Sequence, residues 1–334
     1  MAYNITLIPG DGIGPEVTYA AKKVLDALNI DINWDIKEAG ASVIDEYNTP
    51  LPDKVLDSIK KNKVALKGPV TTPVGRGFRS VNVMLRKSLN LYANIRPIKT
   101  YKGVTSKYKD INLIIVRENT EDLYAGIEHM ITDDIAESVK IISRKASDRI
   151  VEHAFNLARK DKRNKITAVH KANIMKISDG LFLKCAKKVA SKYKDIEFED
   201  VIVDAMAMKL VLNPEQYDIL VMPNLYGDIL SDMAAGLVGG LGLISGANIG
   251  EEVAVFEAAH GAAPDIAGKN KANPTACILS AAMMLKYIGE DEKGIKIEKA
   301  IEKVLEEGKC LTEDLGGNSS TEEFTEEVIN KLSI

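Results

Sequence analysis

Residues 4–29, NITLIPGDGIGPEVTYAAKKVLDALN, decide the fold class of this chain. The apolar run at 4–8 is typical of a buried strand and leads into a glycine-rich turn. From Pro15 onward, apolar residues recur with the 3.6-residue period of a helix. The same alternation of short strands and longer helices continues along the chain. We therefore predict an α/β fold with mostly parallel strands.

Apolar runs and helical periodicity place the remaining elements. Further strands are expected at KVALKG (63–68), INLIIVRE (111–118), NKITAVHK (164–171), FEDVIVD (198–204), YDILVMP (217–223) and EVAVFEAAH (252–260). Helices are expected at 51–61, 80–90, 145–160, 174–192, 228–240, 274–288, 294–307 and 321–332. The glycine-rich run at 239–250 is expected to be a surface loop.

The bulk composition limits the partners. At 334 residues and 46% hydrophobic content, the chain is long enough for two domains or for one large domain with a full core. Its 44 basic and 48 acidic residues give a net charge of −4, which provides no overall attraction to nucleic acid or to an anionic membrane. The apolar segments are too short or too interrupted to span a bilayer. We expect neither a nucleic-acid nor a membrane partner.

Cysteine usage indicates a reducing compartment. Cys185, Cys277 and Cys310 are widely separated, odd in number and form no CxxC pair, so reduced structural thiols are expected. The chain begins with a strand pattern and not with a leader, which favours a cytoplasmic location. No cysteine or histidine spacing indicates zinc, and His129, His153 and His170 are expected to be structural or surface groups.

The glycines at 8–16, IPGDGIGPE, do not form the usual dinucleotide fingerprint. Gly10, Gly12 and Gly14 are spaced G-x-G-x-G and are followed at once by Pro15, whereas the fingerprint requires G-x-G-x-x-G and a later acidic residue. We therefore expect a fold other than the standard Rossmann fold, with a tight turn beside a ligand at this point. Any cofactor loop must lie elsewhere.

Two carboxylates four residues apart, Asp228 and Asp232, lie in PNLYGDILSD (223–232). On a helix opened by Gly227 they would share one face and form half of a site for Mg²⁺ or Mn²⁺, which prefer oxygen ligands. The alternative is a solvated helix N-terminus, where acidic residues complement the helix dipole. The spacing alone leaves both interpretations open.

Arg86, Arg96 and Arg117 each lie near the end of a predicted element and in apolar surroundings. Taken singly, each could be an ion-paired surface residue, but guanidinium groups are also the preferred clamps for carboxylates. Together with the two aspartates they indicate a metabolite with several carboxylates. Ser80 is a plausible N-cap of the helix that carries Asn82 and Arg86, and those two are i, i+4 neighbours. Both Ser80 and Asn82 would then face the same anion.

Six segments in order resemble the metal-dependent β-decarboxylating dehydrogenases, the family of isocitrate and 3-isopropylmalate dehydrogenases. They are IPGDGIGPE, SVNVMLRKSLNLYANIRP, VRENTEDLYAGIEH, AVHKANIMKISDGLF, MPNLYGDILSDMAAGLVGGLG and HGAAPDIAGKNKANP. The likeness runs from about Thr6 to Leu332 and is strongest to the NAD-dependent isocitrate dehydrogenases. It implies a two-domain fold of the family's type, with a discontinuous large domain at 1–99 and 255–334. A small domain at 100–254 would make the dimer contact.

The resemblance implies roles for the matching residues. Arg86, Arg96 and Arg117 would clamp the substrate carboxylates, while Ser80 and Asn82 would bind the γ-carboxylate of isocitrate. Asp228 and Asp232 would be metal ligands with Asp204, which the family contributes from the neighbouring subunit. The cation would chelate the C2 hydroxyl and a carboxylate. Lys171, also from the partner subunit, would help remove the hydroxyl proton as hydride leaves for NAD, and Tyr124 would protonate C3 after loss of CO₂.

The resemblance also implies that the segment HGAAPDIAGKNKANP (260–274) holds the adenosine of the cofactor. Asp265 would accept hydrogen bonds from the ribose hydroxyls and would repel a 2′-phosphate, which favours NAD over NADP. Ala262 and Lys271 depart from the family pattern, so some use of NADP stays open. The expected cofactor contacts are Thr71, Asn173, His260, Gly261, Ala263, Asp265, Ile266 and Asn273.

We therefore expect oxidative decarboxylation of isocitrate to 2-oxoglutarate, a step of the tricarboxylic acid cycle, by a homodimer with shared active sites or by a larger oligomer. The alternatives are a homoisocitrate or 3-isopropylmalate dehydrogenase and a non-catalytic regulatory subunit. An isopropylmalate enzyme needs an apolar wall, and placing that substrate against Ser80 and Asn82 would leave buried polar atoms unpaired at about 1–3 kcal/mol each. Regulatory subunits tend to lose catalytic groups, which this chain retains.

Overall fold

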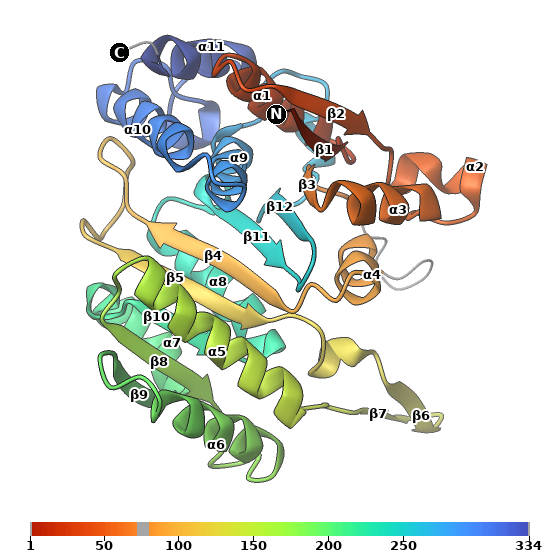
Figure 1. Ribbon diagram of the computed structural model, residues 1–334, viewed down its shortest axis with the longest axis vertical. Helices are drawn as coiled ribbons and strands as arrows, with labels where there is room; N and C mark the ends of the chain where they lie inside the picture. The colour runs from red at the N-terminus through yellow and green to blue at the C-terminus, as the bar shows by residue number, and fades with distance from the viewer. Residues whose placement is uncertain (1, 72–79, 333–334) are drawn as a thin grey trace. The chain divides into compact units, whose positions relative to one another are not determined.

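The computed structural model of the chain, in which residues 2–71 and 80–332 are described, divides into two compact units (Figure 1). Unit 1 comprises Met1–Leu91, Thr100–Lys109 and Val238–Ile334, and unit 2 comprises Tyr92–Lys99 and Asp110–Leu237. The domain division expected from the sequence is also discontinuous, but it assigns residues 92–99, 100–109 and 238–254 the other way. Within the described part of the chain, no helix combines the length and apolarity that crossing a bilayer would require.

Unit 1 is built on a mostly parallel sheet. Its strands run in the order β2 (Ile32–Ile36), β1 (Tyr3–Ile8), β3 (Val64–Lys67), β12 (Ala254–Ala258) and β11 (Ser245–Ile249). Only β11 is antiparallel to its neighbour, β12. The helices are α1 (Gly14–Asp26), α2 (Ile44–Tyr47), α3 (Asp53–Asn62), α4 (Val81–Ser88), α9 (Thr275–Tyr287), α10 (Asp291–Glu307) and α11 (Thr321–Leu332).

Two groups of helices cover the strands of unit 1. Helix α9, ACILSAAMML in its middle, is apolar on all sides because it packs on β3, β11 and β12 and also contacts α1 and α10. Helices α3 and α4 contribute Val55, Ile59 and Leu85 to a second cluster that includes Ala65 of β3. Side chains alternate along a strand, so Leu66, the next residue of β3, points to the opposite face.

Unit 2 is also an α/β layer structure. Its strands run in the order β4 (Ala93–Lys99), β5 (Asn112–Glu118), β10 (Ile219–Met222), β8 (Lys165–His170) and β9 (Glu197–Ile202), and only β4 is antiparallel to its neighbour. Figure 1 shows α5 (Arg144–Lys160) in front of these strands and α8 (Asn224–Leu237) behind them. The remaining helices are α6 (Ser178–Ala190) and α7 (Val203–Leu212). A separate antiparallel hairpin is formed by β6 (Glu128–Thr132) and β7 (Ile135–Ser138).

Parallel strands bring distant segments to one edge of each sheet. In unit 2, β5 ends beside Arg117, β10 leads into α8, β8 ends just before Lys171, and β9 ends just before Asp204. In unit 1, the carboxyl ends of β1, β3 and β12 lead into residues 9–14, 68–71 and 259–265. Ligands of α/β sheets bind at carboxyl ends of this kind. The predicted site residues therefore follow from the strand directions.

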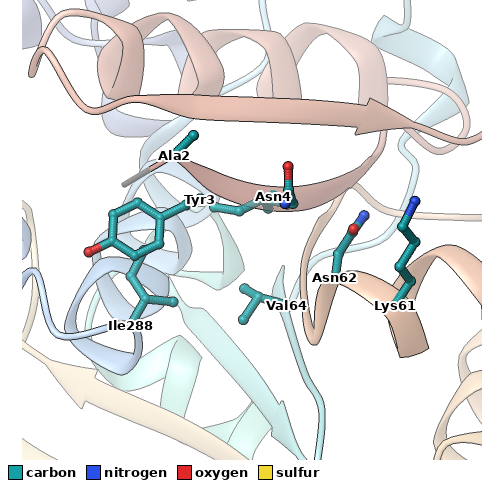
Figure 2. A pocket seen from close by; sticks show the side chains of 8 residues that line it. Ala2, Tyr3, Asn4, Lys61, Asn62, Val64 and Ile288 are labelled. Carbon is teal, nitrogen blue, oxygen red and sulfur yellow. The ribbon is translucent and has the colours of Figure 1, made fainter.

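The opposite, amino-terminal edge of the unit 1 strands carries a pocket of about 340 Å³. Figure 2 shows Tyr3 and Ile288 side by side at one end of it and Lys61 and Asn62 at the other. The Asn62 amide already donates to Thr6 Oγ1 at 3.0 Å. None of the predicted site residues lines this pocket.

The predicted α/β class, the mostly parallel strands, the strands at the seven apolar runs and the helices are confirmed, with helix ends displaced by a few residues. Three predictions are wrong. The run at 239–250 is not only a loop, since it contains β11, and α8 begins at Asn224, before Gly227. The segment at 203–204 is not strand, because α7 begins at Val203. Strands β2 and β4, helix α7 and the hairpin were not predicted; β4 contains Pro97, which weakens a strand pattern.

We predict that Gly227→Ala destabilises unit 2. An added Cβ at Gly227 would lie 2.4 Å from Arg117 Cγ, closer than atoms can approach, so the expected loss is about 1–3 kcal/mol of unfolding free energy. Gly236→Ala, on the same helix with no heavy atom within 4 Å, is the control and should stabilise by up to about 1 kcal/mol. Chemical denaturation measures both, and equal stability of the two variants would contradict the prediction.

Candidate active site

Two arginines on neighbouring strands of unit 2 reach the same helix, α8. Arg117 of β5 is 1% exposed, and its Nε donates to Asn224 Oδ1 at 2.8 Å while its Nη1 donates to Asp228 Oδ1. Arg96 of β4 donates from Nη1 to Ser231 Oγ at 2.6 Å and to Asp232 Oδ1 at 2.7 Å. The structure thus brings the two predicted arginines and the two predicted aspartates into one cluster.

Tyr124 completes this cluster. It lies on the short 3₁₀ helix η2 (Leu123–Ala125), and its hydroxyl donates to Asp228 Oδ2. The guanidinium carbon of Arg117 lies 5.0 Å from the centroid of the Tyr124 ring, a cation–π contact. Gly227 permits the close approach of α8 to Arg117, because no side chain lies between them. A phenol, two guanidinium groups and two carboxylates therefore lie together at the carboxyl end of β5.

The arginines and the aspartates of this cluster differ in their exposure to solvent. The arginine side chains are 1% and 8% exposed, whereas those of Asp228 and Asp232 are 38% and 55% exposed. Neither aspartate lies in the first turn of α8, so the helix dipole does not explain them. Accessible carboxylate oxygens on one helix face are the ligand type that Mg²⁺ and Mn²⁺ prefer. These two residues fit half of a divalent-metal site.

Lys171 and Asp204 form a separate pair in unit 2. The Lys171 ammonium contacts Asp204 Oδ1, and this contact lowers the pKa of the Asp204 carboxyl. Asp204 lies in the first turn of α7 and its side chain is 68% exposed. Within the described part of the chain, no three Asp, Glu, His or Cys side chains are close enough together to hold a metal ion. A single copy therefore does not gather Asp204 with Asp228 and Asp232.

In unit 1, Ser80, Asn82 and Arg86 lie at the start of α4 or within it. Ser80 occupies the predicted N-cap position, although its side chain makes no capping hydrogen bond. Asn82 and Arg86 are one turn apart, and the atoms Asn82 Oδ1 and Arg86 Nε are buried without a hydrogen-bond partner among the described residues. A buried polar atom left unpaired costs about 1–3 kcal/mol, which a polar ligand would recover.

Glu257 of β12 is a buried residue of this region that the sequence did not indicate as a partner of Arg86. Its carboxylate lies 2.6 Å from Lys67 Nζ and 3.5 Å from Arg86 Nη2, and it accepts from Asn248 Nδ2 at 2.7 Å. Burial alone would raise the pKa of Glu257, but the two cations outweigh burial and lower it to about 2. The sequence contains a signal that Glu257 has a buried cationic partner, since a charged residue within the apolar run EVAVFEAAH needs a buried counter-charge.

The predicted cofactor segment follows β12 and contains the short 3₁₀ helix η5 (Pro264–Ile266). Asp265 is exposed, and Ala263 has a positive φ of 38°. Asn273 Nδ2 donates to Asp314 Oδ2 at 2.9 Å, while Thr275 N donates to Asn273 Oδ1. Gly261, like Asp265, is exposed. The segment thus exposes the acidic side chain of Asp265 on a short 3₁₀ helix.

His260, at the start of this segment, has a ring nitrogen available to a ligand. Its Nδ1 lies 3.0 Å from the Gly261 carbonyl oxygen, and its Nε2 is buried without a hydrogen-bond partner in the described ranges. Burial lowers the pKa of His260, so the neutral ring is favoured at neutral pH. A neutral imidazole with an unused nitrogen fits contact with an adenine ring.

The glycine turn after β1 contacts the cofactor segment directly. Ile13 N donates to the Ala262 carbonyl at 2.8 Å, and Gly12, with a φ of 60°, leaves no room for a Cβ beside that carbonyl. The Asp11 carboxylate accepts from the backbone amide of Thr71 at 2.8 Å and also binds Ala41 N. Asp11, which the sequence did not single out, therefore holds Thr71 beside the turn.

The remaining predicted residues lie apart from these contacts. Asn173 is exposed in the turn after β8. His129 is exposed on β6, and His153 is partly buried beside Tyr92, where desolvation lowers its pKa to about 4. His170 contacts Asp200 through Nε2 and accepts from Ala172 N through Nδ1. These three histidines hold structure or lie at the surface.

Comparison with known protein families matches residues 4–328 to the isocitrate/isopropylmalate dehydrogenase family. The crystal structure of isocitrate dehydrogenase from Methylococcus capsulatus superposes with a TM-score of 0.97 and 52% identity, covering 99% of this chain and 100% of that one. Mitochondrial NAD isocitrate dehydrogenase catalytic subunit 5 of Arabidopsis thaliana is 51% identical over 98% of this chain and 88% of its own length. A mitochondrial regulatory subunit of the NAD isocitrate dehydrogenase of Dictyostelium discoideum is 51% identical over 99% of this chain and 92% of its own length. This chain belongs to the isocitrate/isopropylmalate dehydrogenase family.

Proposed function

We propose that this chain catalyses the oxidative decarboxylation of isocitrate to 2-oxoglutarate and CO₂ with NAD and a divalent metal, Mg²⁺ or Mn²⁺. The observation that carries the proposal is the cluster of Arg96, Arg117, Tyr124, Asp228 and Asp232 at the carboxyl end of β5. It combines buried cations for substrate carboxylates with accessible carboxylates for a metal. The named relatives at about 50% identity are NAD isocitrate dehydrogenase subunits, which supports the same reaction here.

Substrate choice rests on Ser80 and Asn82. A hydroxyl at the Ser80 position and the buried, unpaired Asn82 Oδ1 on α4 favour a polar group and oppose an isopropyl group. Asn82 could meet a carboxylate through its amide nitrogen or a hydroxyl through its oxygen. Isocitrate, with its γ-carboxylate, is therefore favoured over 3-isopropylmalate, and homoisocitrate is the nearest competitor.

The residues of this chain have defined tasks in such a reaction. When bound, the divalent cation would polarise the C2 hydroxyl and NAD would accept the hydride from C2. Lys171, as the neutral amine, would help remove the proton of the C2 hydroxyl and would become an ammonium. After the β-carboxylate leaves as CO₂, Tyr124 would deliver a proton to C3, and its hydrogen bond to Asp228 holds the phenol in place before reaction.

We also propose that two copies share their active sites, with Asp204 and Lys171 supplied by the partner subunit. The support is a set of large apolar side chains that unit 2 exposes on the hairpin, on the turn after β8, and on α7 and α8. They are Ile127, Met130, Ile131, Ile135, Ile174, Ile177, Met208, Val211, Leu212 and Ile229, with Ile177 91% exposed. Exposed apolar groups of this extent favour burial against another chain. A homodimer is the simplest assembly, and a cytoplasmic location stays a prediction.

We predict turnover with isocitrate, NAD and Mn²⁺ that chelation by EDTA abolishes.

Ser80→Leu should lower kcat/KM for isocitrate by about 10- to 100-fold, since a hydrogen bond to a charged group contributes about 1.5–3 kcal/mol. It should not harm 3-isopropylmalate turnover. Ser88→Leu, on the exposed end of α4, is the matched control. Steady-state assays with isocitrate, homoisocitrate and 3-isopropylmalate measure this, and an inactive purified chain would favour a regulatory subunit.

We predict that Asp265→Lys combined with Ile266→Tyr raises the ratio of kcat/KM for NADP to that for NAD by about 10-fold or more, a change of about 1.4 kcal/mol. The substitution replaces a repulsive carboxylate with a cation for the 2′-phosphate. Lys271→Ala should change the ratio little, because Lys271 already pairs with Glu313 at 3.1 Å. An unchanged ratio in the double variant would refute the role of the 260–274 segment.

We predict that two inactive variants restore activity when mixed in one dimer. Lys171→Met should remove the proton acceptor and lose about 100- to 10,000-fold in kcat. Asp228→Asn should weaken metal binding in the other half of the site. About half of randomly assembled dimers would be hybrids, each with one intact site of two. About one quarter of wild-type activity should therefore return in the mixture, and about one half in the purified hybrid. Coexpression with two affinity tags isolates the hybrid, and no recovery would mean that one copy supplies both residues.

A further inference from the structure

Asp179 is a fully buried carboxylate in the first turn of α6, and it contacts the segment that carries Lys171. Its Oδ2 accepts from the backbone N–H of Lys171 at 2.6 Å and from the Tyr226 hydroxyl at 3.0 Å. Its Oδ1 lies 2.8 Å from Lys140 Nζ. A buried carboxylate is tolerated only when paired in this way, and removing a partner of such a pair typically costs several kcal/mol.

The Asp179 carboxylate accepts from the backbone N–H of Lys171, at the start of the turn, while the end of the turn is tied to α6 by the hydrogen bonds of Asp179 N and Gly180 N to the Met175 carbonyl. Lys171 is the first residue after β8, and the next described helix begins at Ser178. Within this turn, Ile174 and Met175 donate only to the Lys171 carbonyl, and Ala172 N donates to His170 Nδ1. Asp179 therefore sets where the main chain of Lys171 lies, and the ammonium at the end of that side chain moves with it.

Lys140 connects Asp179 to a second buried carboxylate, Asp122. Lys140 Nζ lies 3.7 Å from Asp122 Oδ1 and 4.3 Å from the centroid of the Tyr226 ring. Asp122, also fully buried, accepts from Leu225 N at 2.9 Å, in the first turn of α8, and from Leu123 N at 2.8 Å, next to Tyr124. The Lys140 ammonium thus contacts two buried carboxylates, and these accept hydrogen bonds from different backbone segments. Asp179 accepts from the backbone of Lys171 and also from the Tyr226 side chain of α8, whereas Asp122 accepts from the backbone next to Tyr124 and in the first turn of α8.

We propose that Asp179 is a positioning residue for Lys171 and that it acts in the active site of the partner subunit, whereas Asp122 positions Tyr124 and Asp228 in the site of its own subunit. This inference rests on the proposed function, in which each site takes Lys171 from the other copy. Two carboxylates that share one lysine would then serve two different active sites.

The first measurement is the kinetics of Asp179→Asn in the homodimer. Asparagine keeps the size of the side chain but removes the charge that balances Lys140. Because a misplacement of about 1 Å can cost about 100-fold, kcat should fall by about 10- to 100-fold. The KM for isocitrate should stay within about two-fold, because Lys171 acts on the proton and does not clamp a carboxylate. Unchanged kcat would overturn the proposal.

Hybrid dimers then show which site is affected. The reference hybrid pairs an Asp228→Asn chain with a Lys171→Met chain, so that its single intact site takes Lys171 from the first chain and Asp228 from the second. Asp179→Asn on the first chain should reproduce the loss in kcat. The same substitution on the second chain should cause a clearly smaller loss, because there it affects the active site only through the Tyr226 hydroxyl of α8. The reverse pattern, or equal losses on both chains, would overturn the proposal.

Asp122→Asn is the matched control, since Asp122 is equally buried and shares Lys140. Its loss should appear when it is placed on the second chain and not on the first. If Asp179→Asn does not assemble, Asp179→Glu keeps the charge but displaces the carboxylate by one methylene, and its loss should follow the first chain in the same way. An inactive reference hybrid would refute the shared site itself, whereas an active one with the wrong pattern would refute only the role of Asp179.

Discussion

The shared direction of parallel strands is the constraint on which the site depends. In unit 2, four parallel strands end at one edge, and each is followed by or ends in a residue of the proposed chemistry: Arg117, Asp228, Lys171 and Asp204. These residues come from segments far apart in the sequence, so no local interaction could gather them. The sheet places them at the same edge in two separate pairs, Arg117 with Asp228 and Lys171 with Asp204. Arg96 is the exception, because β4 is antiparallel and contributes a residue from its middle.

Charge pairing within the cluster keeps the site formed before any ligand binds. A guanidinium group as deeply buried as that of Arg117 requires a counter-charge, and Asp228 provides it. A bound tricarboxylate could take over the arginines while a cation takes over the aspartates, so that the number of charge pairs is preserved. Binding would then exchange partners and would not require burial of new unpaired charge. The partly exposed aspartates are suited to that exchange.

Sequence reasoning identified elements whose patterns are local and missed those that depend on the fold. The apolar runs of β1, β5 and β8 and the helical periodicity of α5 predict their conformation from adjacent residues alone. By contrast, β11 was taken for a loop because its segment is rich in glycine, although it forms a strand by pairing with β12. Strand β4 was missed because its arginine and proline interrupt the pattern. Spacing indicated Asp228, a position near the end of a predicted element indicated Arg117, and the family resemblance indicated Tyr124. None of these identified the partners of Glu257 or Asp179, since the partners of a buried charge come from distant positions, such as Lys67 for Glu257.

Burial distinguishes two uses of carboxylates in this chain. Glu257 and Asp179 are almost inaccessible, and each has a cation at one carboxylate oxygen and a hydrogen-bond donor at the other, so exchanging their partners would leave charges unpaired inside the protein. They fix the geometry of Arg86 and of the Lys171 turn. Asp228, Asp232 and Asp204 are paired as well, but water reaches them, and they can release a cation to accept another. The accessible carboxylates are therefore the ones suited to bind a metal, and the buried ones hold Arg86 and the Lys171 turn in place.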